Sequence, residues 1–338
     1  MSTGLDIGSK TIKVVELKPH GDKLALKSAG AVGYSGAHLE QIQDDQSLAQ
    51  IAQTIKKLIS DAKISSRDVS ISLPESQVFT RILKFPLLNE QEIASAVKWE
   101  AEEYIPLPLN EAVIQHVVLE RQETKNPPQT LVLLTAAARN LVQKYVNLLA
   151  MANINVVGVE TELMSMTRSM APQAGVAVLV DFGARSTDIA IVKDEQLFFS
   201  RSVPTAGEAF TRAVAQALGV TPQQAEEYKR TYGLDENQLE GKVGRALLPI
   251  FKTVTEEIKK AVHYFQLDVK ADAPSSVILA GGTAGMPGVS QAFTRLLGSE
   301  VVIGNAFSKI VVDADSAKNL AGYAPLYTVA VGLAMRGD

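Results

Sequence analysis

The sequence predicts an α/β protein made of two related lobes, and three observations support this fold class. The chain of 338 residues exceeds the size at which one hydrophobic core usually keeps growing, so more than one core is expected. A strand, turn and strand near the start recur in the second half of the chain. A late apolar strand then runs into a glycine pair and a helix, which is a connection typical of α/β folds.

The composition is that of a folded protein and excludes several functional classes. Hydrophobic residues make up 46% of the chain and charged residues 21%, as in globular domains. The formal net charge of -4 gives no electrostatic reason to expect nucleic acid as a partner. With no cysteine and only four histidines, we expect neither disulfides nor an imidazole-rich metal site. Neither a signal peptide nor a run of about 18 apolar residues is present, which favours a cytoplasmic protein.

The first expected element is a hairpin at Gly4–Leu17, with the sequence GLDIGSKTIKVVEL. β-branched runs flank Gly8, a residue suited to positive φ, so a strand, a turn and a second strand are predicted. Asp6 ends the first strand, where a carboxylate can hold hydrated Mg²⁺ while the N–H groups of the glycine turn cradle phosphate oxygens. A plain tight turn is the alternative, because D-x-G turns are common.

Two helices are expected next. Apolar residues recur at helical spacing over Ser47–Ala62. A second helix begins at a capping box formed by Asn89 and Glu92 and ends before Pro106. Its buried stripe consists of Ile93, Val97, Ala101 and Tyr104. Trp99 lies off this stripe, so it is predicted either at the edge of the core or on a partner-binding surface.

The hairpin motif recurs in the second half of the chain. Asp6–Thr11 (DIGSKT) aligns without a gap on Asp181–Ser186 (DFGARS), and apolar β-branched residues follow both copies. A duplicated hairpin indicates two related lobes, and two such hairpins facing each other can clamp a triphosphate. A helical part is expected at Thr221–Asp268, with a strongly amphipathic segment at Lys252–Phe265.

The third motif is the late glycine pair, in Ser275–Val289 with the sequence SSVILAGGTAGMPGV. Glycine at Gly281 and Gly282 lets the backbone approach a ligand that a Cβ atom would block. Close packing of the strand on the following helix is the alternative. A last helix is expected at about Pro325–Met335.

Together these motifs resemble the actin-like ATPase superfamily, which includes actin, Hsp70 and sugar kinases. The resemblance rests on the order and spacing of the two D-x-G motifs and the glycine pair. AVKWEAEEYIPLPLNEAV at Ala96–Val113 and AEEYKRTYG at Ala225–Gly233 resemble signature segments of the PilM family of type IV pilus assembly proteins. The resemblance covers Gly4–Met335. It implies an actin-like ATPase fold, with two RNase H-like lobes around a nucleotide cleft.

The resemblance also implies a division into subdomains. An inserted subdomain IC like that of the division protein FtsA is expected within the first lobe. The implied boundaries are subdomain IA at 1–74, IC at 75–156, the return of IA at 157–174, IIA at 175–216, the helical IIB at 217–271, the rest of IIA at 272–324, and a C-terminal helix returning to IA at 325–338. FtsA carries an amphipathic membrane tip after its final helix, and this sequence stops there, so no direct membrane anchor is expected.

The same resemblance implies a site for Mg²⁺ and ATP or ADP. Asp6 and Asp181 would hold Mg²⁺ through its waters, and Glu162 would orient the attacking water. Because Leu163 replaces the proline that follows this residue in some relatives, slow hydrolysis is expected. Lys13 matches the phosphate-binding lysine of actin, with an ordinary exposed strand lysine as the alternative. The other implied phosphate and nucleoside contacts are Gly8, Ser9, Lys10, Gly183, Ala184, Arg185, Ser186, Gly207, Gly281, Gly282, Thr283 and Met286. Glu226 and Lys229 match positions that contact ribose and adenine, and a solvated ion pair is the alternative.

The function that follows from this resemblance is a nucleotide-binding scaffold in pilus assembly and twitching motility. Its expected partner is the N-terminal cytoplasmic segment of PilN, bound in a groove between IA and IC. Such a protein would be cytoplasmic and peripheral to the inner membrane through its partners, which could include other inner-membrane and motor components or a second copy. A small-molecule kinase of the same superfamily is one alternative, although no matched motif supplies its substrate base. An FtsA-like polymerising division protein is the other.

Overall fold

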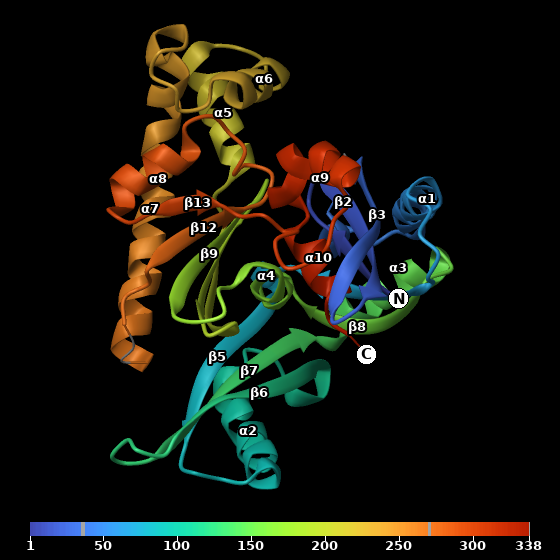
Figure 1. Ribbon diagram of the computed structural model, residues 1–338, viewed down its shortest axis with the longest axis vertical. Coiled ribbons are helices and arrows are strands. Elements are labelled where there is room, and N and C mark those ends of the chain that lie inside the picture. The colour runs from blue at the N-terminus through green and yellow to red at the C-terminus, as the bar shows by residue number, and fades with distance from the viewer. Residues whose placement is uncertain (35–37, 270–271, 338) are drawn as a thin grey trace.

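The first lobe is built on a five-stranded sheet with the strand order β3-β2-β1-β4-β8. The computed structural model describes residues 1–34, 38–269 and 272–337 (Figure 1). The strands of this sheet are β1 (Ser2–Ile7), β2 (Thr11–His20), β3 (Lys23–Gly33), β4 (Asp68–Leu73) and β8 (Asn155–Thr161). β2 runs antiparallel to both of its neighbours, β1 and β3, whereas β4 lies parallel to both β1 and β8.

Helices cover both faces of this first sheet. On one face lie η1 (Leu39–Gln41), α1 (Asp45–Asp61) and α3 (Arg139–Met151), and Ile55, Leu148 and Ile71 belong to the core beneath them. α1 confirms the helix predicted from apolar spacing. On the other face, Val15 and Leu17 pack with Ala330 and Val331 of α10 (Thr328–Ala334).

The second lobe repeats the architecture of the first. Its sheet has the order β11-β10-β9-β12-β13, with the same succession of antiparallel and parallel neighbours. The strands are β9 (Val176–Phe182), β10 (Thr187–Lys193), β11 (Gln196–Val203), β12 (Ser276–Ala280) and β13 (Val301–Ile303). The duplication predicted from two short D-x-G motifs therefore extends to the whole topology of the sheet.

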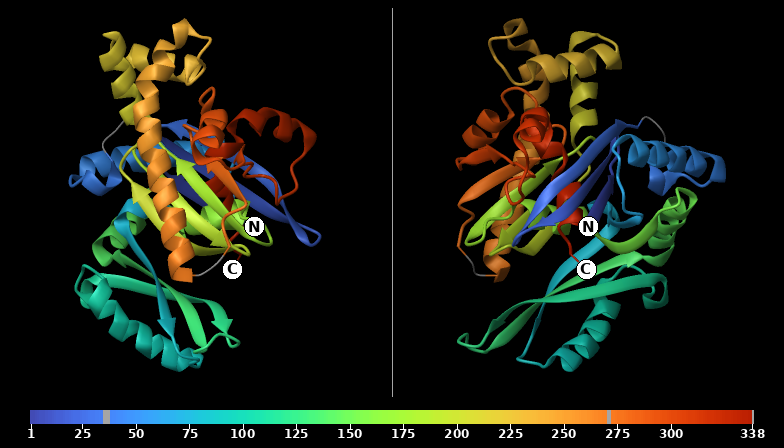
Figure 2. Two further views of the ribbon diagram at one scale, coloured as in Figure 1. Left: turned by 90° about the vertical axis from the view of Figure 1, so that its left-hand side faces the viewer. Right: turned by 45° about the vertical axis from the view of Figure 1, so that its right-hand side comes forward.

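The helices that follow β11 are α5 (Gly207–Leu218), α6 (Pro222–Tyr232), η4 (Leu239–Gly241), α7 (Lys242–Val269), α8 (Val289–Leu297), α9 (Ala314–Leu320) and η5 (Ala321–Leu326). Phenylalanines of α5, α7 and α8 form an aromatic core in the second lobe, whereas Ala324 of η5 packs with β2 and α10 of the first lobe. α7 runs along the second sheet (Figure 2). Its Phe251 meets Phe182 of β9 at 5.6 Å between ring centroids and Phe293 of α8 at 4.7 Å. These buried rings hold α7 and α8 against the sheet.

A smaller segment is inserted in the first lobe after β4 (Figure 1). It consists of η2 (Glu75–Gln77), β5 (Val78–Phe85), α2 (Glu90–Tyr104), η3 (Leu109–Glu111), β6 (Ala112–Gln122) and β7 (Gln129–Ala138). The strands form an antiparallel sheet of order β5-β7-β6, and α2 packs on it through Ile93, Val97 and Ala101. The predicted capping box of Asn89 and Glu92 is present. Trp99 is 76% exposed, so it does not lie at the edge of the core.

The inserted segment ends earlier than the sequence suggested. Residues up to 156 were expected to belong to it. Tyr145 and Leu148 of α3 instead pack in the core of the first lobe, and β8 pairs with β4 of the first sheet. The insertion therefore ends at Ala138, because the apolar face of α3 is covered by α1 and the first sheet.

Two helices join the lobes at the centre of the molecule. Leu163 and Met166 of α4 (Glu162–Met170) pack against the second sheet, although α4 directly follows β8 of the first. α10 lies between α4 and β1. A Cβ atom on Gly332 of α10 would stand 1.8 Å from the backbone oxygen of Ser165, so this close approach requires glycine. α4 and α10 therefore pack with their backbones in close contact between the two lobes.

Candidate functional site

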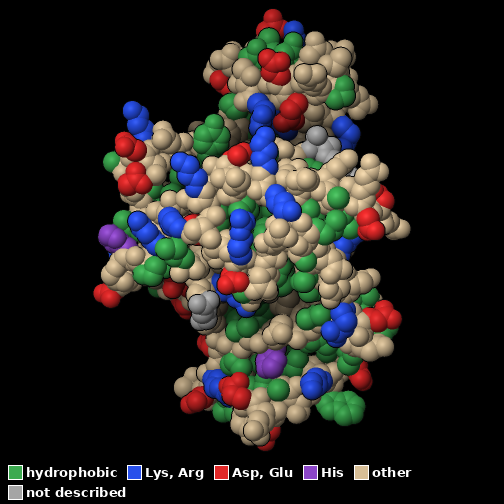
Figure 3. Space-filling view, turned by 90° about the vertical axis from the view of Figure 1, so that its right-hand side faces the viewer, with side chains coloured by type: hydrophobic (Ala, Val, Ile, Leu, Met, Phe, Trp, Pro, Cys, Tyr) green, Lys and Arg blue, Asp and Glu red, His purple; other side chains and the backbone are tan. Residues whose placement is uncertain are grey.

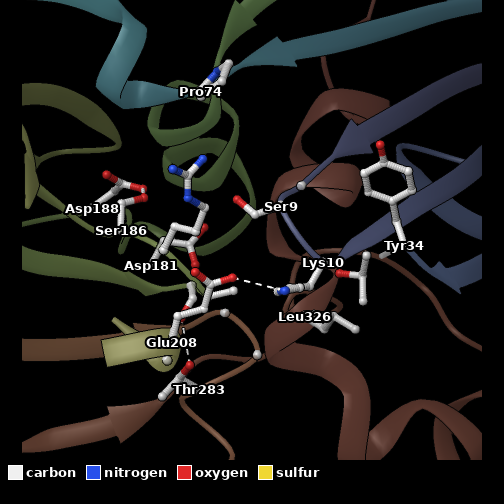
Figure 4. Close-up of a pocket in the computed structure, with 18 of the residues that line it drawn as sticks. Ser9, Lys10, Tyr34, Pro74, Asp181, Ser186, Asp188, Glu208, Thr283 and Leu326 are labelled. Atoms are coloured by element: carbon white, nitrogen blue, oxygen red, sulfur yellow. Dashed lines mark hydrogen bonds and ion pairs between the residues drawn. The ribbon is translucent and has the colours of Figure 1, made fainter. Parts of the chain in front are cut away.

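The two lobes enclose a cleft with a volume of about 1580 Å³, lined by residues from both repeats. Figure 4 shows side chains from both lobes lining it. Every residue for which the sequence suggested a site role lines this cleft: Asp6, Gly8, Ser9, Lys10, Lys13, Glu162, Asp181, Gly183, Ala184, Arg185, Ser186, Gly207, Glu226, Lys229, Gly281, Gly282, Thr283 and Met286. Positions scattered along the whole chain thus meet in one place.

The two repeated turns have the same backbone hydrogen bond. The N–H of Gly8 donates to the oxygen of Thr11 at 3.1 Å, and the N–H of Gly183 donates to the oxygen of Ser186 at 3.1 Å. This bond closes each hairpin and leaves the N–H groups at the tip outside the strand ladder. The tip residues are Ser9 and Lys10 in the first turn and Ala184 and Arg185 in the second. Such tips are suited to bind anionic oxygens.

Asp6 and Lys13 form a buried ion pair in the first hairpin. They face each other across β1 and β2, and Lys13 Nζ lies 2.6 Å from Asp6 Oδ2. Burial lowers the pKa of Lys13, but the Asp6 carboxylate, followed by Asp181 and Glu162, more than offsets this effect, so its pKa is raised. The alternative of an ordinary exposed strand lysine is therefore wrong. Asp6 Oδ1 is buried without a hydrogen-bond partner among the described residues.

The second hairpin has two carboxylates where the first has an ion pair. Asp188 faces Asp181 across β9 and β10, in the position that Lys13 occupies opposite Asp6. Burial, and then Asp188, raise the pKa of Asp181 to about 7. Burial also raises the pKa of Asp188 to about 6, against the hydroxyl groups of Ser202 and Ser186.

Asp188 was not selected from the sequence, although the alignment of the two hairpins could have identified it. Its Oδ2 accepts a hydrogen bond from Ser186 Oγ at 2.9 Å. Its Oδ1 is buried and, within the described ranges, bonds to nothing. Each hairpin thus has one buried carboxylate oxygen without a partner among the described residues, and such an oxygen can accept a hydrogen bond from a ligand or bind a cation.

Glu162 is the first residue of α4, and a hydrogen bond from the inserted segment holds its side chain. Its Oε2 accepts a hydrogen bond from the N–H of Glu75 at 3.2 Å. Burial, followed by Asp188, Asp6 and Asp181, raises the pKa of Glu162 well above its usual range. A raised pKa disfavours the charged form of a carboxyl group, which is the form that acts as a base.

Glu75 is a second buried glutamate that the sequence analysis missed. It is 4% exposed and lies in η2 between β4 and β5. Burial raises its pKa to about 7, against the lowering effect of the Ser200 hydroxyl, and Asp188 raises it further. Because its burial results from packing of the second lobe onto η2, no local sequence pattern indicates it.

The glycine pair and α5 adjoin the second turn. Gly281 has a φ of +84°, and a Cβ atom there would stand 2.3 Å from Asp181 Oδ1. Thr283 Oγ1 donates to the oxygen of Gly183 at 2.7 Å, and the N–H of Gly207 donates to the same oxygen at 3.2 Å. The carbonyl oxygen of Gly183 is therefore used within the protein, and the tip residues Ala184 and Arg185 line the cleft.

Glu226 and Lys229 form a bonded unit on α6. Lys229 Nζ lies 2.6 Å from Glu226 Oε2, 3.0 Å from Thr211 Oγ1 and 3.1 Å from the oxygen of Gly207. A lysine has three donor hydrogens, so these protein acceptors use all of them. In this arrangement Lys229 positions Glu226 and the start of α5, and Glu226 is the residue that can accept a bond from a ligand. The alternative of a solvated pair does not fit, since Lys229 is 6% exposed.

One ion pair crosses the cleft between the lobes. Lys10 Nζ of the first turn lies 3.0 Å from Glu208 Oε1 of α5, and Figure 4 shows Lys10 reaching across to it. Both side chains are partly exposed, so the pair contributes little to stability. It links the first turn to α5 across the cleft by a contact that a competing anion can displace.

Side chains of the described residues do not form a complete metal site on their own, because no group of three histidine, cysteine or acidic side chains among them is arranged to hold a metal ion. A divalent cation here would need oxygen ligands from a bound phosphate and from water in addition to the carboxylates.

Comparison with known proteins assigns the chain to a family. The family described as type IV pilus assembly protein PilM matches residues 4–338. This chain belongs to the PilM family. A solved PilM-PilN type IV pilus biogenesis complex resembles it with a TM-score of 0.85 at 27% identity, over 99% of this chain and 98% of that chain.

This PilM family member also resembles more distant proteins, either in sequence or in structure. FtsA of Streptococcus pneumoniae D39 is 21% identical over 88% of this chain and 74% of its own length. FtsA of Pseudomonas aeruginosa PAO1 is 26% identical, but over only 47% of this chain and 41% of its own length. MreB5 of Spiroplasma citri bound to AMPPNP has a TM-score of 0.51 at 13% identity, over 98% of this chain and 93% of that chain. The fold is the actin-like ATPase fold predicted from the motifs.

Across the described ranges, every helix is too short or too polar to cross a lipid bilayer.

Proposed function

We propose that this protein is a nucleotide-binding scaffold of the type IV pilus machinery, which holds Mg²⁺ with ATP or ADP between its lobes and docks the N-terminal cytoplasmic segment of PilN. The observation that carries the nucleotide part is the pair of turns that line the cleft. The tip N–H groups of each turn lie outside the strand ladder, and each hairpin has a buried carboxylate oxygen without a hydrogen-bond partner among the described residues. The family and the resemblance to a PilM-PilN complex support the partner.

The residues present fit a nucleotide accompanied by a cation. Phosphate oxygens would meet the tip N–H groups and Lys13, whereas Asp6, Asp181 and Asp188 would repel them. A divalent cation between phosphate and carboxylates removes this repulsion and supplies the charge neutralisation that phosphoryl chemistry requires. Nucleotide affinity should therefore depend strongly on Mg²⁺, which would lie nearest Asp6 and Asp181.

Contacts to the nucleoside would come from the opposite end of the cleft. Gly281 and Gly282 give the backbone room beside the second hairpin, and Thr283 fixes the turn at Gly183. Met286 lines the same cleft and is buried. Glu226, held by Lys229, would accept hydrogen bonds from ribose hydroxyl groups. This assignment separates a phosphate end, charged on both lobes, from a nucleoside end on the second lobe.

Hydrolysis should be slow or absent. Glu162 is the candidate for orienting water, yet burial and the neighbouring carboxylates raise its pKa and so disfavour its charged form. Its nearest acidic neighbours raise that pKa rather than activating it as a base. A bound cation would lower the pKa of these carboxyl groups, so some turnover remains compatible with the site. The nucleotide would then serve mainly to fix the relation between the lobes.

The candidate peptide site is a hollow between the first lobe and the inserted segment. Figure 3 presents the face of the molecule where this hollow opens, and hydrophobic side chains surround it. Exposed apolar side chains belong to elements on both sides, Val117 on β6 and Val157 on β8. An extended peptide with apolar anchors would bury such side chains. Docking there would bring the protein to the inner membrane through its partner while the protein itself stays in the cytoplasm.

Calorimetry tests both parts of this proposal. ATP titrated into the protein should bind with micromolar or tighter affinity in Mg²⁺, about 8 kcal/mol, and much more weakly in EDTA. A synthetic peptide of the PilN N-terminal segment should then bind the nucleotide complex, whereas a scrambled peptide should not. Failure of ATP to bind in Mg²⁺ would remove the nucleotide part, and equal binding of both peptides would remove the partner.

A further inference from the structure

The link between the first lobe and the inserted segment is very short. Strand β4 ends at Leu73, and β5 begins at Val78. Pro74 and the single turn η2 connect them, with Pro74 at φ -61° and ψ 135°. A movement of β5 therefore reaches residue 75 with little flexible chain to absorb it.

Glu75 in this link contacts both lobes. Its backbone N–H donates to Oε2 of Glu162 at the start of α4. Its carboxyl group lies against the Thr161 hydroxyl and the N–H of Leu163, which also belong to the start of α4, and against Ser200 of β11 in the second lobe. η2 contacts β11 directly. One residue thus joins the inserted segment, the first lobe and the second lobe.

This junction is buried and incompletely bonded. Glu75 is 4% exposed, and its Oε2 has no hydrogen-bond partner among the described residues. Glu162 accepts a hydrogen bond from the Glu75 N–H at 3.2 Å, so the position of its carboxyl group depends on η2. A hydrogen bond weakens steeply once its atoms move apart, so a small shift of η2 releases the Glu162 side chain from its position beside the cleft.

We propose that Glu75 is a positioning residue that couples the inserted segment to the nucleotide cleft, through the hydrogen bond from its backbone N–H to Glu162. The proposal rests on the proposed function, since it names the route between the peptide hollow and the nucleotide. A peptide that fixes the inserted segment against the first lobe fixes η2, and η2 holds Glu162 toward the cleft. Reciprocity then requires Mg²⁺-ATP to alter peptide affinity by the same factor.

The test measures this coupling factor in matched variants. Peptide affinity is determined by calorimetry with and without saturating Mg²⁺-ATP, and the ratio of the two dissociation constants is compared. Glu75→Pro removes the N–H, and it suits the site because proline is tolerated at the first position of a helical turn and the ψ of Pro74 permits a following proline. Glu75→Gln keeps the N–H and a similar shape. Glu162→Ala removes the acceptor from the other side and serves if Glu75→Pro fails to fold.

We expect a ratio of at least about fivefold in the wild type and in Glu75→Gln, and a ratio near one in Glu75→Pro and Glu162→Ala. The separate affinities for peptide alone should stay within about threefold of the wild type, which a general loss of structure would not allow. Persistence of the coupling in both Glu75→Pro and Glu162→Ala would overturn the inference.

Two further outcomes separate this inference from the proposed function. A wild type that binds peptide and Mg²⁺-ATP independently would overturn the coupling and leave the scaffold function intact. A wild type that binds neither ligand would overturn the proposed function, and the inference with it.

Discussion

Replacing Glu75 with glutamine should change how stability depends on pH. The pKa of Glu75 is raised from 4.5 to about 7 by burial in the folded protein. Between these two values the folded chain retains a proton that the unfolded chain releases, so the wild type loses stability as pH rises. The full difference corresponds to roughly 3 kcal/mol, reached above pH 7. Glutamine does not ionise, so the free energy of unfolding of the Glu75→Gln variant does not decrease in this way as pH rises.

The measured quantity is the stability of Glu75→Gln minus that of the wild type, at pH 5 and at pH 8. Urea denaturation should show this difference increasing by roughly 2.5 kcal/mol between the two pH values, on the order of 3 °C in melting temperature for a chain of this length. Any constant effect of the substitution cancels in the comparison. Glu102→Gln is the control, since Glu102 lies on the exposed face of α2 and should give a difference that does not depend on pH.

The reasoning would be refuted by a difference that is the same at pH 5 and pH 8. In that case Glu75 is ionised in the folded protein over the whole range, and its carboxylate is solvated or paired despite its burial. A difference that decreases with pH would have the opposite meaning, namely that the fold stabilises the charged form.

Three further changes test the cleft itself. Lys13→Met removes the cation from a buried ion pair, so urea denaturation should show the free energy of unfolding reduced by about 3–5 kcal/mol. The control Lys10→Met breaks only the partly exposed pair with Glu208 and should reduce it by less than about 1 kcal/mol. Similar losses in the two variants would contradict a buried ion pair at Lys13. Gly281→Ala places a Cβ atom 2.3 Å from Asp181 Oδ1 at a φ of +84°, so calorimetry should show the affinity for ATP reduced at least about tenfold. In the control Gly282→Ala the new Cβ atom lies 3.6 Å from Leu326, and ATP should bind with normal affinity. Equal affinities of the two variants would argue against a close approach at Gly281. Glu226→Gln should weaken Mg²⁺-ADP binding about tenfold without changing the affinity for Mg²⁺-tripolyphosphate, which lacks a ribose. An equal loss of affinity for the two ligands would place Glu226 at the phosphate end of the cleft.

Sequence patterns revealed the elements whose signals are local. The D-x-G repeat predicted two hairpins, and the register of Asp6 opposite Lys13 follows once the turn is placed. Apolar spacing predicted α1, and the capping box predicted the start of α2. Because these signals depend on neighbours within a few residues, they can be interpreted without the tertiary structure.

The remaining features depend on contacts between distant segments. Periodicity shows that α3 is amphipathic, but it cannot show that the first lobe covers its apolar face, which is why the end of the inserted segment was misplaced. Glu75 gives no local sign of burial, since Ser200 and Asp188 reach it from the second lobe. Asp188 is the intermediate case, because extending the repeat two residues beyond Ser186 sets it opposite Asp181.

The position of Trp99 gives the protein an internal optical reporter. It is the only tryptophan of the chain, and at 76% exposure on α2 its indole is surrounded by water. Emission from such an indole moves to shorter wavelength when a partner covers it. The nucleotide cleft contains no tryptophan, so an emission change during peptide titration would report the inserted segment alone. The unlabelled wild-type chain therefore allows events at the inserted segment to be followed by fluorescence while calorimetry follows the cleft.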